Sequence, residues 1–260
     1  MKNDNLYALL AANFPKAKNA PALILADGRV WTYDDVQHAS ARMAHLLVSL
    51  GLKPGDRVAV QVEKTPEALV LYLATLRAGM VFLPLNPAYQ RHELEYFLGD
   101  ATPGLVVCRP QMRGLIDELA KAAKVPNVLE LDDAGQGSLI DAATPFADTF
   151  ETAPRTGDDL AAILYTSGTT GRSKGAMLTH RNLAVNAQTL HAYWKFRKGD
   201  VLLHMLPIFH VHGLFVASHC ALLNGSAMLF EPKFDGKRAL ALLPQATVFM
   251  GVPTYYVRLL

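Results

Sequence analysis

Short apolar runs alternate with helix-like segments through the first half of the chain, and this alternation constrains the fold more than any other feature. Residues 57–62 form a short predicted strand, residues 69–76 carry leucine and tyrosine at helical spacing between a cap at Thr65 and Gly79, and residues 80–85 form the next predicted strand. Strands joined by helices in this way lie parallel in a sheet, with helices covering both of its faces. The sequence therefore predicts an α/β fold of wound, mostly parallel sheets with helices on both faces.

Turn and capping residues divide the rest of the chain into further elements. We expect strands at 22–25, 30–33, 105–108, 128–131 and 160–165, and helices at 35–50, 93–98, 113–123 and 180–191. Residues 132–158 are rich in Asp, Thr, Pro, Gly and Ala, and we expect an irregular connection there. The predicted subdomains are therefore residues 1–158, which include this connection, and residues 159–260.

Composition and charge narrow the classes of protein. A chain of 260 residues with 51% hydrophobic and 18% charged residues builds a core without disulfides or metals. Cys108 and Cys220 lie far apart and make no disulfide framework, as is typical of a reducing compartment. Residues 1–159 carry a net charge of −5 and residues 160–260 one of +7. The basic part favours an anionic partner, and because its cations are scattered and lack interleaved aromatic residues, we expect a small phosphorylated or carboxylated ligand and no nucleic acid.

Residues 201–230 contain no Asp, Glu, Lys or Arg, so a membrane span has to be considered. Pro207, Gly213, Gly225 and four histidines break this stretch into pieces shorter than the ~20 apolar residues that a spanning helix needs. The N-terminus also shows no small-residue cleavage site of a secretory signal. We therefore expect a buried core here and no membrane span.

A loop rich in glycine and hydroxyl side chains carries the chemistry. It follows the predicted strand at 160–165 and reads Thr-Ser-Gly-Thr-Thr-Gly-Arg-Ser-Lys-Gly over residues 166–175. Its three glycines let backbone N–H groups face a ligand, its five hydroxyls donate hydrogen bonds, and Arg172 and Lys174 add positive charge. The pattern indicates a phosphate-binding loop.

This loop has two other interpretations. It is not a Walker A loop, because counting from Gly168 places Ser173 where that pattern requires glycine. A surface loop of Gly, Thr and Ser without a ligand is the other interpretation, and the complete string behind a buried strand argues against it.

The segment YTSGTTGRSKGAMLTH, residues 165–180, resembles the phosphate-binding signature of the adenylate-forming superfamily of acyl-CoA synthetases, peptide-synthetase adenylation domains and luciferases. One departure is Ser173, where the family commonly has proline. Further segments resemble family blocks in the same order: WTYDDV (31–36), LKPGDRVAV (52–60), LRAGMVFLPLNPAY (76–89) and LPIFHVHGL (206–214). The resemblance covers essentially the whole chain and implies two stacked αβ subdomains of the family's N-terminal domain.

The resemblance implies an acid–thiol ligase that uses ATP, Mg²⁺ and coenzyme A. In this family a carboxylate attacks the α-phosphorus of ATP, pyrophosphate leaves, and a thiol captures the acyl adenylate. Hydrogen-bond donors aimed at the leaving pyrophosphate stabilise the transition state more than the ground state. The implied phosphate-binding residues are Thr166, Ser167, Gly168, Thr169, Thr170, Gly171, Arg172, Ser173 and Lys174.

His210 matches a family position between the acyl pocket and the α-phosphate, and the resemblance implies a catalytic role for it. A metal site with the neighbouring histidines is the alternative, but their spacing fits none of the usual zinc patterns, so we expect no metal ligands. His204 and His219 are expected to be core histidines. His212 is left open between core and site.

The segments PIFHVHGLFVAS, PKFD and MGVPTYYVRLL resemble the malonyl-CoA synthetase branch, which implies malonate, or methylmalonate, as the acid. The second carboxylate of malonate stays charged at neutral pH and needs a cation when it is buried. Arg258 is the expected partner, by bidentate pairing. The alternative is an ordinary surface arginine.

Several family blocks find no match: the adenine- and ribose-binding segments, the glutamate that helps to bind Mg²⁺, and the C-terminal domain with its lysine. We therefore expect an N-terminal fragment that is inactive by itself, in a protein that is cytoplasmic because it needs ATP and coenzyme A. The open alternatives are a synthetase for a medium-chain or aryl acid, and a binding module without chemistry. The sequence does not predict an oligomeric state.

Overall fold

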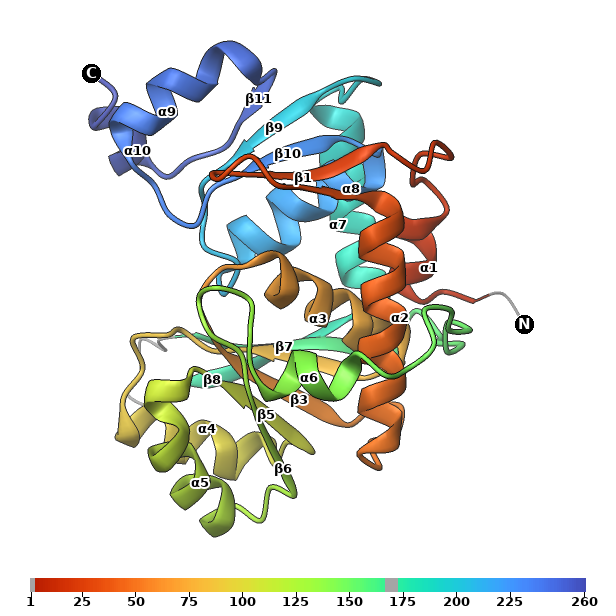
Figure 1. Ribbon diagram of the computed structural model, residues 1–260, viewed down its shortest axis with the longest axis vertical. Coiled ribbons are helices and arrows are strands. Elements are labelled where there is room, and N and C mark those ends of the chain that lie inside the picture. The colour runs from red at the N-terminus through yellow and green to blue at the C-terminus, as the bar shows by residue number, and fades with distance from the viewer. Residues whose placement is uncertain (1–2, 167–172) are drawn as a thin grey trace. The chain divides into compact units, whose positions relative to one another are not determined.

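The computed structural model describes residues 3–166 and 173–260 (Figure 1). Contacts divide the chain into two units. The first unit contains the described part of residues 1–8 together with residues 38–183, and the second contains residues 9–37 and 184–260. The chain thus passes from one unit to the other within three helices, α1 (Leu6–Ala11), α2 (Tyr33–Ser49) and α7 (His180–Tyr193).

The sheet of the first unit has the strand order β6-β5-β3-β4-β7-β8. All neighbours are parallel except β7 and β8, which pair antiparallel. The strands are β3 (Arg57–Gln61), β4 (Val81–Pro84), β5 (Leu105–Cys108), β6 (Asn127–Glu130), β7 (Leu160–Thr166) and β8 (Lys174–Thr179).

Helices cover both faces of this sheet. In register, Ala59 of β3 lies between Leu83 of β4 and Val106 of β5, and all three pack in one buried cluster with α4 (Arg91–Ala101) and α5 (Arg113–Ala122), which lie side by side in Figure 1. Successive side chains of a strand point to opposite faces. Phe82, one position before Leu83, accordingly meets Tyr72 of α3 (Pro66–Arg77), with ring centroids 5.0 Å apart.

Helix α3 shows how local sequence and packing agree. The Thr65 side chain caps its N-terminus by accepting a hydrogen bond from the Ala68 N–H, and Pro66 occupies the first helical position. Eleven of its twelve residues are buried, as expected of a helix that is apolar on all sides. The helix expected between the Thr65 cap and Gly79 is confirmed.

The sheet of the second unit has the order β11-β9-β10-β1-β2. Its members are β1 (Pro21–Leu25), β2 (Val30–Thr32), β9 (Val201–His204), β10 (Ala227–Phe230) and β11 (Val248–Phe249). Only β1 and β2 are antiparallel, joined by a turn in which Gly28 has a φ of +87°. The remaining helical elements are α6 (Ser138–Ala143), α8 (His219–Asn224), α9 (Gly236–Leu242), α10 (Pro253–Val257), the 3₁₀ turns η1 (Pro110–Met112) and η3 (Leu243–Gln245), and the π-helical η2 (His212–Ser218).

The uncharged stretch at 201–230 forms β9, η2, α8 and β10, so it supplies two strands of this sheet and the helical segment between them. Most of its side chains are buried. No helix within residues 3–166 and 173–260 is long and apolar enough to cross a membrane.

The predicted α/β class, with mostly parallel sheets flanked by helices, is confirmed. The division of the chain differs from the expected boundary between residues 158 and 159. Strands β7 and β8 extend the first sheet because β7 pairs with β4, and residues 21–32 join the second sheet because β1 pairs with β10. The expected irregular connection at 132–158 contains one short helix, α6.

Candidate functional site

Residues 166–174 are expected to bind phosphate and are called the phosphate loop for this reason; they connect two antiparallel strands at the edge of the first sheet. Thr166, the last residue of β7, pairs with Lys174, the first residue of β8, and Tyr165 pairs with Gly175. Thr166 and Lys174 are exposed and Ser173 is half-buried. The other expected phosphate-binding residues, Ser167, Gly168, Thr169, Thr170, Gly171 and Arg172, lie outside the described residues.

Gly175 has a packing role that its place in the glycine-rich string does not reveal. It lies in β8, and a Cβ atom at this position would lie 3.1 Å from Cγ2 of Ile163 and 3.4 Å from the Tyr165 ring. The Tyr165 ring stacks on Phe97 of α4, with centroids 4.2 Å apart. The absence of a side chain at Gly175 therefore makes room for the tyrosine that precedes the phosphate loop.

Two tyrosine hydroxyls connect the ends of the loop to helix α4. Tyr165 donates a hydrogen bond to Oδ2 of Asp100, and Tyr96 donates to the Ser173 carbonyl oxygen at 2.8 Å. Burial, and next the hydrogen bond to Asp100, raise the pKa of Tyr165 well above its ordinary value, so the phenol stays protonated and remains a donor. Tyr96 and Asp100 also line a pocket of about 410 Å³ along α4.

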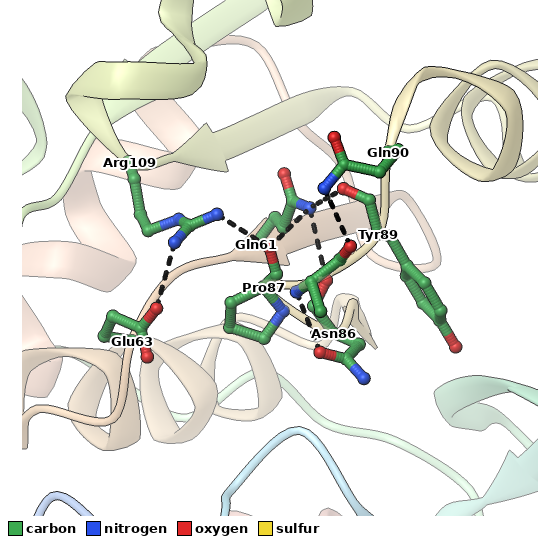
Figure 2. Close-up of polar contacts among 8 residues, drawn as sticks. Gln61, Glu63, Asn86, Pro87, Tyr89, Gln90 and Arg109 are labelled. Carbon is green, nitrogen blue, oxygen red and sulfur yellow. Dashed lines mark hydrogen bonds and ion pairs between the residues drawn. The ribbon is translucent and has the colours of Figure 1, made fainter.

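In parallel sheets, ligands commonly bind at the carboxyl ends of the strands. Here the segment at 86–90 lies over the end of β3, and the Gln61 side chain donates to the carbonyl oxygens of Asn86, at 3.2 Å, and Tyr89, at 2.9 Å (Figure 2). Arg109, just after β5, donates to the Pro87 carbonyl oxygen at 2.6 Å and pairs with Glu63 at 3.0 Å. These side chains order the segment that follows β4.

Two atoms of this network lack a partner among the described residues: Oε1 of Gln61 and Nε of Arg109, both buried. One is an acceptor and the other a donor, and a buried polar atom of either kind normally finds a partner in protein or ordered water.

Gly213 constrains the backbone of the segment around His210, because there is no room for a side chain at this position. A Cβ atom on Gly213 would lie 2.0 Å from the Pro207 carbonyl oxygen. Gly213 belongs to η2, and π-helical turns occur frequently at functional sites. His210 is exposed, its ring lies against Phe209 with centroids 4.4 Å apart, and partial burial lowers the pKa of His210 below 6.5. The imidazole is therefore mainly neutral at pH 7.

Of the other histidines between residues 201 and 230, His204 and His219 lie in the core and His212 lines a pocket. The His204 ring is buried with Nε2 at 3.0 Å from the Gly213 carbonyl oxygen, and His219 is buried in the core, where burial lowers its pKa to about 3. His212 is half-buried and lines a pocket. Within the described part of the chain, no group of three His, Cys, Asp or Glu side chains is placed to hold a metal ion.

This pocket has a volume of about 340 Å³ and is lined mainly by aromatic and apolar side chains. Its lining residues are Trp194, Phe196, Asp200, His212, Val248, Phe249, Met250, Gly251 and Tyr256. Among these lining residues, Asp200 is the only one with a carboxylate, and His212 is the only one whose side chain can become positively charged. His212 also has a pKa lowered by burial, so the pocket lining alone supplies little positive charge for an anion.

Arg258 follows α10 and is exposed. Its backbone N–H donates to the carbonyl oxygens of Thr254 and Tyr255. Its charge acts on the Tyr255 hydroxyl, where it partly offsets the rise in pKa that burial causes. Neither Arg258 nor His210 is among the residues that line the 340 Å³ pocket. Each lies two positions from a residue that does line it: Arg258 follows Tyr256, and His210 precedes His212. The second unit thus brings both segments with expected substrate residues to one pocket.

Sequence reasoning missed Tyr96 and Asp100. Their contacts with the loop ends span 77 and 65 positions of the chain, so no local pattern announces them. The available signal was Tyr165 itself, a large phenol directly before the phosphate loop, which needs a partner when it is partly buried.

Two mostly parallel sheets flanked by helices make this an α/β protein, with a glycine-rich sequence between the two strands at one edge of the first sheet. The family model described as AMP-binding enzyme matches residues 10–260, and the chain belongs to this family. The fold matches crystal structures of MatB from Rhodopseudomonas palustris, apo and with ATP bound, with a TM-score of 0.95 and 52% identity over 99% of this chain and 51% of that chain.

Two curated relatives are similar over most of the chain. An oxalate–CoA ligase of Arabidopsis thaliana is 32% identical, over 98% of this chain and 51% of its own length. The mitochondrial malonate–CoA ligase ACSF3 of Mus musculus is 36% identical, over 88% of this chain and 40% of its own length. The chain therefore spans about half the length of the relatives it matches.

Proposed function

We propose that the whole protein is an AMP-forming acid–thiol ligase that joins malonate to coenzyme A at the expense of ATP. The observation that carries the proposal is the similarity to MatB, 52% identity at a TM-score of 0.95 over 99% of the chain. The identity of 36% to a malonate–CoA ligase supports the choice of acid.

The phosphate loop is assigned to the β- and γ-phosphates of ATP. Thr166, Ser167, Thr169, Thr170 and Ser173 supply hydroxyl donors, Gly168 and Gly171 allow close approach of the backbone, and Arg172 and Lys174 supply charge. The ATP-bound structure of MatB supports this assignment of ligand. Lys174, exposed at the start of β8, is free to point at a bound anion.

Magnesium and coenzyme A complete the reaction that we propose. Mg²⁺ is commonly held by substrate phosphates and only one or two carboxylates, so it needs no cluster of acidic residues in the described part of the chain. Mg²⁺ held by the phosphates would neutralise part of their negative charge. A compartment that contains ATP and coenzyme A is required, and we propose the cytoplasm.

His210 is assigned to the reacting carboxylate and the α-phosphate. Because its imidazole is mainly neutral at pH 7, it offers one N–H donor and one acceptor in place of a fixed charge. This suits a residue that holds an oxygen atom during attack on phosphorus without pairing permanently with the pyrophosphate.

Arg258 is assigned to the second carboxylate of malonate. The pocket that Tyr256 lines, two positions before Arg258, lacks a permanent cation, and Arg258 is exposed. If binding buries the second carboxylate of malonate against Arg258, removing the arginine from that buried pair costs roughly 2–5 kcal/mol. We expect Arg258→Ala in the whole protein to lower kcat/KM for malonate about thirtyfold or more, and that for a monocarboxylate such as butyrate far less.

The matched control is Lys237→Ala, which removes another exposed cation from the same unit. Turnover is measured as pyrophosphate release with each acid. Equal losses for malonate and butyrate in the Arg258 variant would overturn the assignment of Arg258.

Oxalate is the second candidate acid, because an oxalate–CoA ligase is 32% identical over 98% of the chain. Oxalate is one methylene shorter than malonate, so the distance between the two carboxylates distinguishes the substrates. Acid-dependent pyrophosphate release with oxalate, malonate, methylmalonate and butyrate decides between them. We expect the highest kcat/KM with malonate, and a higher value with oxalate would reject malonate as the substrate.

A further inference from the structure

Helix α10, which directly precedes Arg258, has few local interactions that hold it in place. It contains five residues, all at least partly exposed, and within the described residues its N-cap residue Val252 makes no side-chain hydrogen bond to the helix. An isolated helix this short is unstable in water. The position of α10 therefore depends on the side chains that it packs against the rest of the second unit.

Tyr255 and Leu259 are the side chains that make this contact. Both are half-buried, whereas Tyr256, Val257 and Arg258 between them are exposed. Residues four apart in a helical turn lie on the same face. Both side chains pack against one buried cluster of the second unit, which consists of Leu203, Met205, Leu229, Ala239 and Leu242. Arg258 is therefore carried by a turn of chain whose inner face is formed by Tyr255 and Leu259.

Tyr255 also joins α10 to the carboxyl ends of two neighbouring strands. Its ring stacks on Phe234, in the segment after β10, with centroids 3.9 Å apart and ring planes at 11°. Its hydroxyl donates a long hydrogen bond of 3.4 Å to the carbonyl oxygen of Met205, directly after β9. Because β9 and β10 are parallel neighbours, these two contacts hold α10 at one edge of the second sheet.

Arg258 lies beside Tyr255 and the start of α9. Gly236 is the first residue of α9, and a Cβ atom there would lie 3.2 Å from the backbone carbonyl oxygen of Arg258. Figure 1 accordingly shows α9 and α10 next to each other. Burial raises the pKa of Tyr255, and the charge of Arg258 partly offsets this rise, so the phenol and the cation are close enough to interact.

The same edge of the sheet leads to His210. Met205, which accepts the hydrogen bond from Tyr255, begins the segment that connects β9 to His210. In the proposed function His210 meets the reacting carboxylate and Arg258 meets the second one, so the separation of these two residues has to match the acid. The contacts of Tyr255 fix the Arg258 side of this separation.

We propose that Tyr255 is a positioning residue that docks α10 on the ends of β9 and β10 and thereby places Arg258 for the second carboxylate of a diacid. The proposal rests on the proposed roles of His210 and Arg258. A misplacement of about 1 Å can lower a rate by about a hundredfold, even when it originates away from the reacting atoms. An acid without a second carboxylate makes no use of Arg258, so loss of the Tyr255 contacts should affect malonate selectively.

The test measures kcat/KM for malonate and butyrate in the whole protein, as pyrophosphate release. Tyr255→Leu removes the stacked ring and its hydroxyl, and Phe234→Leu removes the partner ring. We expect each change to lower kcat/KM for malonate about tenfold or more and that for butyrate less than about twofold. Tyr255→Phe keeps the ring pair and loses only the long hydrogen bond, so its kcat/KM for malonate should stay within about threefold of the original. Turnover of butyrate reports that each variant is folded.

The double variant, Tyr255→Leu with Phe234→Leu, separates the ring pair from two unrelated losses. Both single changes break the same contact, so we expect the double variant to lose no more malonate turnover than the more affected single variant. A double variant whose loss equals the product of the two single losses would show that the ring pair is not responsible, and would overturn the proposal.

Tyr33→Phe is the matched control. The Tyr33 hydroxyl donates to the Ser226 carbonyl oxygen at 2.8 Å in the same unit, so this variant loses a shorter phenol–carbonyl hydrogen bond that does not involve α10. We expect its melting temperature to fall at least as far as that of Tyr255→Phe, with an unchanged ratio of kcat/KM for malonate and butyrate. Equal losses for both acids in Tyr255→Leu overturn the positioning role, and equal losses in Arg258→Ala as well overturn the assignment of Arg258 with it.

A second readout does not depend on the activity. The backbone N–H groups of Arg258 and Leu259 donate to carbonyl oxygens of α10, so their hydrogen exchange reports how often this turn opens. We expect severalfold faster exchange at these two amides in Tyr255→Leu and Phe234→Leu than in Tyr33→Phe. Unchanged exchange overturns the proposal even if the protein is a malonate ligase. Faster exchange in a protein without malonate-dependent activity rejects the proposed function and retains the docking of α10 by Tyr255.

Discussion

Among the residues near His210, Gly213 is the one that the surrounding backbone leaves no room to replace. A Cβ atom there would lie 2.0 Å from a carbonyl oxygen of Pro207, which is backbone and has no side-chain freedom to move away. Overpacking of this kind typically costs about 1–3 kcal/mol or more. We expect Gly213→Ala to lower the melting temperature by several degrees.

Gly114→Ala is the control for that measurement. Gly114 lies in α5 with nothing within 4 Å of its potential Cβ atom, and alanine favours a helix over glycine by roughly 0.5–1 kcal/mol. The same chemical change should therefore stabilise one site and destabilise the other. A stabilised Gly213→Ala protein would contradict the close approach to Pro207.

His180 makes the stability depend on pH. Its Nδ1 accepts a hydrogen bond from the Leu6 N–H at 3.0 Å, and burial, aided by the charge of Arg155, lowers the pKa of His180 to about 4. In the unfolded chain the pKa returns to about 6.5, so the unfolded state binds the proton first as the pH falls. The contribution of His180 is therefore complete above pH 6.5 and is lost between about pH 6.5 and 4, on the order of 3 kcal/mol.

Urea unfolding at pH 7.5, 5.5 and 4.5 measures this loss. His219, whose pKa burial lowers to about 3, changes stability in the same direction and remains in every variant. We expect His180→Gln to be less stable at pH 7.5 but to lose less stability on acidification. An identical pH dependence of the original and the variant would show that His180 is not responsible.

Among the elements, α3 depends on a single cap at the centre of the first unit. The Thr65 Oγ1 accepts from the Ala68 N–H at 3.1 Å, and both residues are buried, so water cannot replace the lost acceptor. We expect Thr65→Ala to destabilise the protein by about 1–2 kcal/mol in denaturant unfolding, and Thr65→Ser to be nearly neutral because it keeps the oxygen atom. Equal effects of both changes would assign the loss to the methyl group.

Local elements were largely predictable because their signals are local. Thr65 and Pro66 mark the start of α3, Asp27 and Gly28 mark the turn between β1 and β2, and the structure confirms both. The short helix α6 was missed because it lies in a stretch whose Asp, Gly and Pro content favours loops.

Long-range partners were not predictable in the same way. The pairing of β1 with β10 and the contact of Tyr96 with Ser173 join residues that are remote in sequence and leave no periodic pattern. The boundary of the two units differs from the expected one for this reason. Of the candidate site, the loop and its flanking strand were predictable from composition and order, but the aromatic support on α4 was not.

On the scale of the whole molecule, the chain leaves the second unit after residue 37 and returns to it at residue 184. The five-stranded sheet of that unit is complete only when Leu23 to Leu25 of β1 pair with Met228 to Phe230 of β10. Residues of β1 and β10 should therefore open together, and independently of β3 in the first unit.

Hydrogen exchange tests this cooperativity. Leu23 is fully buried, and Leu23→Ala costs about 2–5 kcal/mol in a well-packed core. We expect faster amide exchange at residues 228–230 but not at residues 58–60, and the reverse in Val58→Ala, whose side chain is buried in the first unit. Equal acceleration in both units in either variant would show that they open as one.

The pairing of β1 with β10 also has a consequence during protein synthesis. Roughly 200 residues separate the two strands, and ribosomes add about 5–20 residues per second, so β1 waits some 10–40 s for its neighbour. Throughout this time the hairpin of β1 and β2 exposes an unpaired edge, while every strand of the first sheet emerges and pairs. The β1 edge thus stays without its parallel neighbour until β10 has left the ribosome.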